Sequence, residues 1–451
     1  MDTGMLTVGI LTLGCKVNQY ESEATAEELT RRGFRVLTPD ERCDAYIINT
    51  CAVTAEAARK SRQMIRRLRT RSPGAFIIVT GCLAETSADE LAAIASVDAV
   101  VGNARKLAAV DELERLVASG KGAEGAAFNG IGTLDGSTFE PMRISAFSRT
   151  RVYVKVEDGC ENRCSYCIIP DARGPVRSKP KAEALAEIAG LVRGGAREVV
   201  ITGIEVASYG RDLGDTNLED LLCAADELPE VRDNGVRVRL GSLEPSLLRP
   251  EFIKRIAGLS SVAPHFHISL QSGCSRTLAA MRRKYNAERA MQVINDLREA
   301  IPGVQFTCDV IVGFPGETDD DFAETLDFMR RARFLAAHVF PYSPRRGTPA
   351  AVMPDQIPET EKHRRAAALA SLEKGIRLSL IEEVAAAHPV CRVLFESFDG
   401  KTAVGHTDQF IEVRVPSDKD LHGMFLPVRL CGVEEDPSFE YGSVCNGTVV
   451  Y

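Results

Sequence analysis

Short apolar runs alternate with helix-like segments through the first quarter of the chain. The apolar runs are rich in β-branched residues, have the length of buried strands, and span residues 7–14, 45–50, 75–81 and 98–102. Segments with helical periodicity lie between them, at residues 21–32 and 54–69. Alternation of this kind predicts an open parallel sheet covered by helices.

A second alternating series fills the middle of the chain. Six strand-like runs lie at residues 153–158, 197–203, 236–242, 265–272, 306–313 and 336–343. Helical patterns separate them, for example at residues 182–193, 218–227 and 319–331. Because six βα units are fewer than the eight that close a TIM barrel, the pattern predicts an open, partial (β/α)6 barrel.

The pattern changes after a long helical stretch at residues 359–387. Short strand-like runs with turn signals follow at residues 391–398, 410–416, 425–433 and 447–451, which predicts a small β-barrel or sandwich. Residues 119–141, between the first two series, carry six glycines and little periodicity. The chain is therefore expected to be an α/β protein with domains at residues 5–118, 146–380 and 381–451 and a linker at 119–145.

Composition is that of an ordinary globular protein. The 451 residues are 45% hydrophobic and 26% charged, and no apolar run reaches the roughly 18 residues of a membrane span. The segment MDTGMLTVG has an acidic residue and no basic region, so it does not resemble a signal peptide. We therefore expect a cytoplasmic protein, in which thirteen cysteines indicate metal or redox chemistry rather than a disulfide framework.

Charge is unevenly distributed along the chain. The net charge of −8 is opposite in sign to that of most nucleic-acid-binding domains. The stretch from Arg59 to Arg71, RKSRQMIRRLRTR, nevertheless carries seven basic residues and no acid. On charge alone this run is either a solvated helix face or a phosphate-contacting surface.

Three cysteines stand close together in the segment GCENRCSYCIIP, and we call Cys160, Cys164 and Cys167 the local triplet. In a straight helix the outer two would lie about 10 Å apart along the axis, too far apart for one cluster. Gly159 and Pro170, on either side, favour a wrapping loop. Structural zinc, the second possibility, takes four closed ligands. Three thiolates suit a [4Fe–4S] cluster that keeps one iron open.

Three further cysteines each end a predicted strand of the first series. Cys15, Cys51 and Cys82, which we call the dispersed triplet, follow the first, second and third of those runs. A single cysteine of this kind is most simply a small buried apolar residue. Because ligands bind at the carboxyl ends of parallel strands, three in corresponding places predict a second metal site.

The local triplet and the six strands behind it resemble the radical S-adenosylmethionine superfamily. In that family the open iron chelates S-adenosylmethionine, and the ends of the strands supply further contacts. The resemblance implies cofactor contacts at Thr202, Gly203, Glu205, Ser242, Glu244, Gln271, Asp309 and Gly313. As alternatives, the two glutamates are rim charges and the segment GFPG is only a turn. His265 and His267 are expected to be polar groups of the barrel interior rather than metal ligands.

Longer segments resemble the methylthiotransferase family over nearly the whole chain. TLGCKVNQYESE, NTCAVT and TGC resemble its N-terminal domain, and CSYCIIPDARGPVRS, TGIEVASYG, SLQSGC, DVIVGFPGET and HVFPYSPRRGTPA resemble its radical domain. The β-rich C-terminal segment resembles the TRAM module, a small β-barrel. KVNQY and ARGPVRS are most similar to the branch that adds methylthio at C2 of N6-threonylcarbamoyladenosine, beside the tRNA anticodon.

The resemblance implies a tRNA methylthiotransferase with two [4Fe–4S] clusters and S-adenosylmethionine. The local triplet would hold the cluster that cleaves S-adenosylmethionine, and the dispersed triplet the cluster that carries the sulfur. The implied partners are a tRNA anticodon stem-loop and an electron donor such as flavodoxin, without a membrane. The implied phosphate contacts, besides the basic run, are Arg173, Arg177, Lys179, Arg345 and Arg346. Alternatives are methylthiolation of isopentenyladenosine or of a ribosomal-protein aspartate, and a non-enzymatic metal-binding RNA module.

Overall fold

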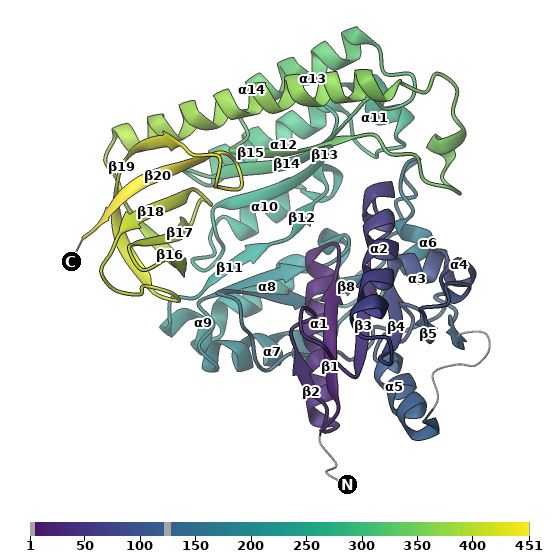
Figure 1. Ribbon diagram of the computed structural model, residues 1–451. Helices are drawn as coiled ribbons and strands as arrows, with labels where there is room; N and C mark the ends of the chain where they lie inside the picture. Colours follow the sequence, from purple (N-terminus) through teal and green to yellow (C-terminus); the bar gives the residue numbers. More distant parts are fainter. Residues whose placement is uncertain (1–4, 121–127, 451) are drawn as a thin grey trace.

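Three regions of secondary structure follow one another in this computed structural model, which describes residues 5–120 and 128–450 (Figure 1). The first is a parallel six-stranded sheet of order β2-β1-β3-β4-β5-β6. Its strands are β1 (Thr7–Thr12), β2 (Arg35–Leu37), β3 (Ala45–Thr50), β4 (Phe76–Gly81), β5 (Ala99–Val101) and β6 (Phe128–Gly130). Its helices are α1 (Lys16–Arg31), α2 (Ala55–Arg71), α3 (Cys82–Thr86), α4 (Ala88–Ala92) and α5 (Ala108–Ser119). The predicted open parallel sheet is confirmed.

The sequence pattern does not predict β2 or β6. Each has only three residues, and they form the two outer edges of the sheet. β6 lies inside the predicted linker at 119–145 and pairs with β5, while residues 121–127 of that linker lie outside the described residues. This part of the predicted linker is thus a short strand at the edge of the N-terminal sheet.

The second region is a set of parallel strands in two adjoining sheets. β7 (Arg151–Lys155), β10 (Glu198–Thr202) and β11 (Arg237–Leu240) form one sheet, and β12 (Ser242–Leu243), β13 (His265–Gln271), β14 (Gln305–Val312) and β15 (Ala336–Pro341) form the other. β11 and β12 are the two parts of one predicted run, divided at Gly241. The strands alternate with α7 (Lys181–Arg193), α8 (Leu218–Glu227), α9 (Pro229–Asp233), α10 (Pro250–Ile256), α11 (Ser275–Ala280), α12 (Ala287–Ala300) and α13 (Asp319–Ala332). β7 and β15 are the outer strands, as an open partial barrel requires.

The third region is a closed β-barrel that follows the long helix α14 (Glu359–Ala386). Its strands are β16 (Val390–Phe398), β17 (Thr402–Thr407), β18 (Glu412–Pro416), β19 (Phe425–Glu435) and β20 (Ser443–Val449), closed in the order β16-β17-β18-β20-β19. The predicted small β-barrel is confirmed, although β17 is not predicted and Tyr451 lies outside the described residues. Within residues 5–120 and 128–450, no helix is long and apolar enough to cross a membrane.

One aromatic side chain of the C-terminal barrel fixes it to the central region. The ring of Phe410 stacks on those of His265 and His406, with centroids 4.6 and 4.7 Å apart. The guanidinium groups of Arg151 and Arg239 lie over the same ring, 5.1 and 5.0 Å from its centroid. Because cation–π contacts gain strength where water is excluded, this contact holds the two regions together.

Helix α1 is shared by the cores of the first two regions. Leu29 packs in a core of the N-terminal sheet, whereas Tyr20 and Ala24 belong to the large core of the central barrel. The Tyr20 hydroxyl lies 2.8 Å from a carboxylate oxygen of Glu187 and accepts a hydrogen bond from Nζ of Lys179 at 2.9 Å. The N-terminal sheet is thus docked on the barrel by a buried polar contact as well as by apolar packing.

We predict that Tyr20→Phe destabilises the cluster-free protein by about 1–3 kcal/mol, because Lys179 and Glu187 would each lose a buried partner. Urea denaturation followed by circular dichroism measures the change. Tyr153→Phe is the matched control, since Tyr153 is only partly buried and its hydroxyl forms no hydrogen bond with the described residues. Equal midpoints for the two variants would contradict the prediction.

Candidate functional site

The local triplet lies in an irregular loop between β8 (Glu157–Asp158) and α6 (Ile169–Arg173). Gly159 has φ of +90°, and a Cβ there would lie 1.9 Å from the carbonyl oxygen of Pro175, so only glycine fits. This turn starts a loop that returns to α6, and the predicted wrapping loop is confirmed. The loop follows β7 at the end of the barrel where active-site loops lie.

All three thiols of the local triplet are free. Burial raises the pKa of Cys160 well above its ordinary value and that of Cys167 to about 12. Nη1 of Arg283 donates a hydrogen bond to Sγ of Cys164 at 3.2 Å. Three free thiols in one loop suit an iron–sulfur cluster, whose assembly would displace their protons.

Two buried carboxyls lie beside this loop, at the ends of β10 and β12. Glu244 accepts hydrogen bonds from Nδ2 of Asn162, inside the loop, and from Oγ of Ser246 at 2.8 Å. Its carboxylate also lies 3.7 Å from Nη2 of Arg283. The structure therefore brings Glu244, but also Asn162 and Arg283, to the cysteine loop. The motif search missed these last two because nothing in the sequence shows which polar residues face the loop.

Glu205 is the most perturbed carboxyl of this group. Burial, and then the neighbouring Glu244, raise the pKa of Glu205 to about 8, so it is protonated at neutral pH. Its Oε1 is buried and has no hydrogen-bond partner among the described residues. A cationic ligand, such as the amino group of S-adenosylmethionine, would favour the ionised form of Glu205, and the unpaired oxygen would accept its hydrogen bond.

Other predicted cofactor residues also end barrel strands. Thr202 is buried at the end of β10, and a Cβ on Gly203 would lie 2.4 Å from Oε2 of Glu157. Gln271, at the end of β13, has φ of +64°, a left-handed conformation that is strained for a residue with a side chain. Ser242 is half-buried in β12. These positions stay predicted cofactor contacts.

Two predicted cofactor residues have local partners of their own. A Cβ on Gly313, where φ is +71°, would lie 2.4 Å from Cγ of Lys362 on α14, so helix packing already requires glycine. Asp309 lies on β14, where its carboxylate is 3.1 Å from Nε2 of His267. Thr307 Oγ1 is within hydrogen-bond distance of the rings of His265 and His267, so both histidines are barrel-interior polar groups, as predicted.

The barrel interior is partly open to solvent. Alternate positions of β13 and β14 are half-exposed, among them His267 and Asp309, while the positions between them are buried. Lys16, at the start of α1, is solvent-exposed, yet desolvation and then the charges of Arg151 and Arg239 lower its pKa. The influence of these two arginines, on β7 and β11, places Lys16 near the strands of the barrel.

The dispersed triplet ends three adjacent strands of the N-terminal sheet. Cys15, Cys51 and Cys82 follow β1, β3 and β4, which are neighbours in the strand order. A Cβ on Gly14 would lie 3.0 Å from Sγ of Cys51, so glycine lets the first two strand ends approach closely. Burial raises the pKa of Cys51 to about 11. Among the described residues, no group of three or more His, Cys, Asp or Glu side chains is arranged to hold one metal ion.

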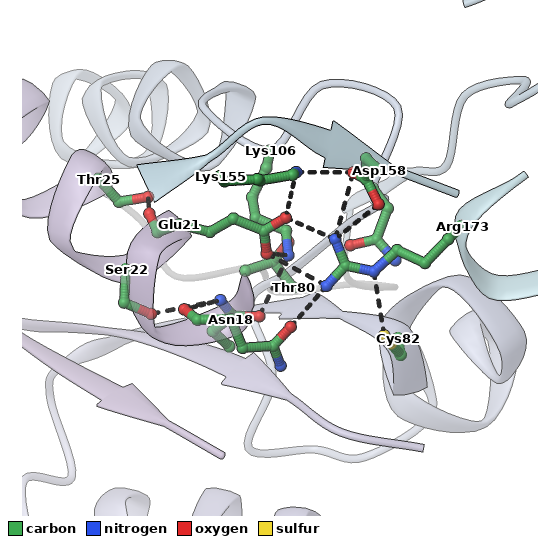
Figure 2. A network of polar contacts seen from close by, with 12 residues as sticks. Asn18, Glu21, Ser22, Thr25, Thr80, Cys82, Lys106, Lys155, Asp158 and Arg173 are labelled. Carbon is green, nitrogen blue, oxygen red and sulfur yellow. Dashed lines mark hydrogen bonds and ion pairs between the residues drawn. The ribbon is translucent and has the colours of Figure 1, made fainter. Parts of the chain in front are cut away.

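Arg173, six residues after Cys167 in the chain, contacts the dispersed triplet (Figure 2). Its Nε donates a hydrogen bond to Sγ of Cys82 at 3.3 Å, and its Nη1 donates to Glu21 of α1 at 2.5 Å. Ala172, beside it on α6, packs in the same hydrophobic core as Cys82. The carboxyl edge of the N-terminal sheet therefore faces the cysteine loop of the barrel.

This geometry corrects part of the predicted phosphate surface. Arg173, Arg177 and Lys179 are fully buried and bound to protein groups, so they are not available to RNA phosphates. Sequence charge alone does not show burial, and these cations pair with carboxylates from distant segments. Arg345 is half-buried, with Nε donating to the carbonyl oxygen of Val53 at 3.1 Å. Arg346 is exposed, as are Arg59, Lys60, Arg66 and Arg67 of the basic helix α2.

Comparison with known proteins identifies the fold and the class. Residues 154–329 match the model of the "Radical SAM superfamily", and residues 7–102 match that of the "Uncharacterized protein family UPF0004". A solved radical S-adenosylmethionine methyltransferase from Kitasatospora setae, with cobalamin and a [4Fe–4S] cluster bound, superposes with a TM-score of 0.57 and 17% identity. The superposition covers 77% of this chain and 74% of that chain. Barrel, cysteine loop and family model together define a radical S-adenosylmethionine enzyme, a class that uses S-adenosylmethionine and a [4Fe–4S] cluster.

Curated relatives match this chain over nearly its whole length. "Threonylcarbamoyladenosine tRNA methylthiotransferase MtaB" of Bacillus subtilis is 38% identical over 439 residues, covering 94% of each chain. "tRNA-2-methylthio-N(6)-dimethylallyladenosine synthase" of Moorella thermoacetica is 34% identical, covering 94% of this chain and 95% of that relative. The chain belongs to the radical S-adenosylmethionine methylthiotransferase family.

Glu205 generates a pH-dependent prediction for the cluster-free protein. The pKa of Glu205 is about 8 in the folded protein and 4.5 ordinarily. Its contribution to the free energy of unfolding is therefore complete below pH 4.5 and is lost as the pH rises through 8. Glu205→Gln stays neutral throughout. We therefore expect the free energy of unfolding of this variant, relative to that of the native protein, to rise by roughly 1–4 kcal/mol between pH 5 and pH 8.

Thermal melts across that pH range measure the difference. Glu251→Gln, at an exposed position in the first turn of α10, is the matched control and should follow the native curve. Parallel curves for Glu205→Gln and the native protein would show that Glu205 ionises normally.

Proposed function

We propose that this enzyme is a tRNA methylthiotransferase that adds a methylthio group at C2 of N6-threonylcarbamoyladenosine, next to the anticodon. The observation that carries the proposal is the pair of cysteine triplets, which belong to two facing strand-end sites joined through Arg173. The substrate that the Bacillus subtilis relative is named for favours this nucleoside. Such a substrate implies the cytoplasm as the place of action.

In this proposal each triplet holds one [4Fe–4S] cluster, within domains at residues 5–118 and 146–380. With S-adenosylmethionine bound, the local cluster supplies the radical chemistry that an unreactive aromatic C–H bond requires, and the dispersed cluster carries the sulfur. Glu205 and Glu244 are the groups that would bind the amino end of S-adenosylmethionine. The remaining strand-end positions, from Thr202 to Gly313, would complete its pocket.

The chain itself binds and orients the base. The target carbon lies on the Watson–Crick edge, so the base must leave its stack and enter a pocket. The half-exposed interior positions of β13 and β14 offer such a pocket, with Asp309 and His267 as hydrogen-bonding groups. Lys16 is exposed, one residue after Cys15, with an ammonium group suited to an anionic substituent.

The basic helix α2 is the proposed contact for the anticodon stem. Arg66 and Arg67 are exposed, and neither forms an ion pair with the described residues. Other cations of the run are already paired, as Arg59 is with Glu56 at 2.6 Å. The C-terminal barrel at residues 381–451 offers a second RNA surface, and a small electron carrier such as flavodoxin would supply the reductant.

The two cysteine triplets make separable predictions. Cys160→Ala should abolish reductive cleavage of S-adenosylmethionine, whereas Cys51→Ala should keep cleavage and lose methylthiolation. Each should lower the iron content from about eight to about four per chain. Cys308→Ala, which removes a buried cysteine in the strand β14, is the matched control and should change none of these measurements. Methylthiolation by Cys51→Ala would contradict the role of the dispersed triplet.

Nucleoside analysis distinguishes the proposed substrate from the alternatives. In a strain lacking this gene, mass spectrometry of tRNA nucleosides should show loss of 2-methylthio-N6-threonylcarbamoyladenosine alone. Loss of the methylthio derivative of isopentenyladenosine would favour the substrate that the Moorella relative is named for. Unchanged nucleosides would favour a ribosomal-protein aspartate, and iron-free protein would favour a metal-binding RNA module.

Replacing Arg66 and Arg67 by glutamine should weaken tRNA binding without changing iron content. Each lost phosphate contact means that one counterion fewer is released on binding. The slope of the logarithm of the binding constant against the logarithm of the salt concentration should therefore become shallower by about 0.7–0.9 per contact. Filter binding at several salt concentrations measures this slope. Arg330→Gln, on the exposed last turn of α13, is the control. An unchanged slope would exclude α2 from the RNA surface.

A further inference from the structure

A buried network of charged side chains lies beside Cys82 of the dispersed triplet (Figure 2). Its members come from segments far apart in the sequence: Glu21, Lys106, Lys155, Asp158, Arg173 and Arg177. Each is at most 5% exposed. Glu21 accepts from Lys106, from Lys155 at 2.7 Å and from Arg173 at 2.5 Å. Asp158 lies 2.7 Å from Lys155, 3.3 Å from Arg173 and 3.4 Å from Arg177.

The charges of this network do not balance. Four cations, Lys106, Lys155, Arg173 and Arg177, face two carboxylates, Glu21 and Asp158. The direct ion pairs thus leave cationic groups in excess in a buried part of the molecule, and burial lowers the pKa of Lys106. Unpaired buried charge costs several kcal/mol per ion. An anionic partner beside these cations would lower that cost.

Neighbouring acids make no direct ion pair with these four cations within the described residues. Glu85 accepts a hydrogen bond from the backbone amide of Asn103 at 2.7 Å, and Glu140 accepts hydrogen bonds from those of Lys106 and Leu107 at 2.9 Å. Both acids interact with cations of the network only at longer range. Burial raises the pKa of Glu157 well above its ordinary value.

The unbalanced charge is directed at the dispersed triplet. Nε of Arg173 donates to Sγ of Cys82 at 3.3 Å, and its Nη2 donates to Oδ1 of Asn18 at 2.5 Å. Nδ2 of Asn18 in turn donates to the carbonyl oxygens of Leu13 at 2.7 Å and Thr50 at 3.0 Å. Leu13 and Thr50 immediately precede the strand ends that carry Cys15 and Cys51. One guanidinium group is thus linked to all three strand ends.

We propose that this network holds an anionic iron–sulfur cluster on the dispersed triplet, with Arg173 as the positioning residue that sets the cluster's reduction potential. The inference rests on the second cluster of the proposed function and adds the group that tunes it. A [4Fe–4S] cluster in its 2+ state with three thiolate ligands is an anion, the sign that the network lacks. Net charge and hydrogen bonds to the sulfurs are two of the factors that determine cluster potentials.

The direction of the effect follows from electrostatics. Reduction adds negative charge to the cluster, so a nearby cation and an N–H···S hydrogen bond favour the reduced state. Arg173→Lys keeps the cation but loses the hydrogen bond to Cys82. Arg173→Met loses both. The potential should therefore fall in Arg173→Lys and fall further in Arg173→Met.

The test uses protein in which Cys160, Cys164 and Cys167 are all replaced by alanine, so that only the dispersed triplet can bind iron. The protein is reconstituted with iron and sulfide without oxygen, its iron is counted, and the cluster is titrated by electron paramagnetic resonance. At a fixed applied potential, Arg173→Lys should lower the ratio of reduced to oxidised cluster at least tenfold. For one electron this corresponds to a fall of 59 mV in the reduction potential of the cluster. Arg377→Lys is the matched control, because Arg377 is equally buried on α14, where it donates to Oγ of Ser443 at 2.8 Å.

Each outcome separates the inference from the proposed function. An absence of iron from the background protein overturns the second cluster, and this inference with it. If Arg173→Lys retains its iron and the reduction potential of the cluster is unchanged, the role of Arg173 is overturned, whereas the second cluster is not. Iron lost from Arg173→Lys but kept by Arg377→Lys supports it, because the network then holds the cluster. Equal effects of the two substitutions overturn it, since any buried arginine would matter as much.

Discussion

The buried ion pairs of Glu21 are the constraint on which the arrangement of this molecule depends. Glu21 belongs to the N-terminal sheet, whereas two of its partners, Lys155 and Arg173, belong to the barrel. Breaking a buried pair by removing one partner costs about 3–5 kcal/mol, because the other charge is left without compensation. The sheet and the barrel must therefore meet with their carboxyl edges opposed, which brings the two sets of cysteines onto one junction.

That junction links assembly of the site to its protonation. Burial raises the pKa of Cys51 and Cys167, so the metal-free thiols hold their protons at neutral pH. Binding of a cluster must release these protons, and the bound cluster then places negative charge beside the surrounding cations. A protein built this way is more stable loaded than empty, since a ligand that binds only the folded state stabilises it.

The sequence predicted the repeating elements better than the contacts between them. Helix α8 begins and ends where its periodicity does, at Leu218 and Glu227, because amphipathic period and core packing agree there. β2 and β6 were missed since three residues are too few to show a period. The cysteines could be found because thiols at strand ends are chemically distinctive. Arg173 was misassigned to the surface, because only the folded chain shows which carboxylates enclose a cation.

Phe410 has a consequence for how a large RNA is chosen. Its ring is held by His265, Arg151 and Arg239 of the central region, so the C-terminal barrel is fixed against that region and not only through α14. The separation between that barrel and the cysteine junction is therefore set by the protein. If the proposed RNA touches both, its stem and its unstacked base must match that spacing, and any adjustment would fall on the RNA loop.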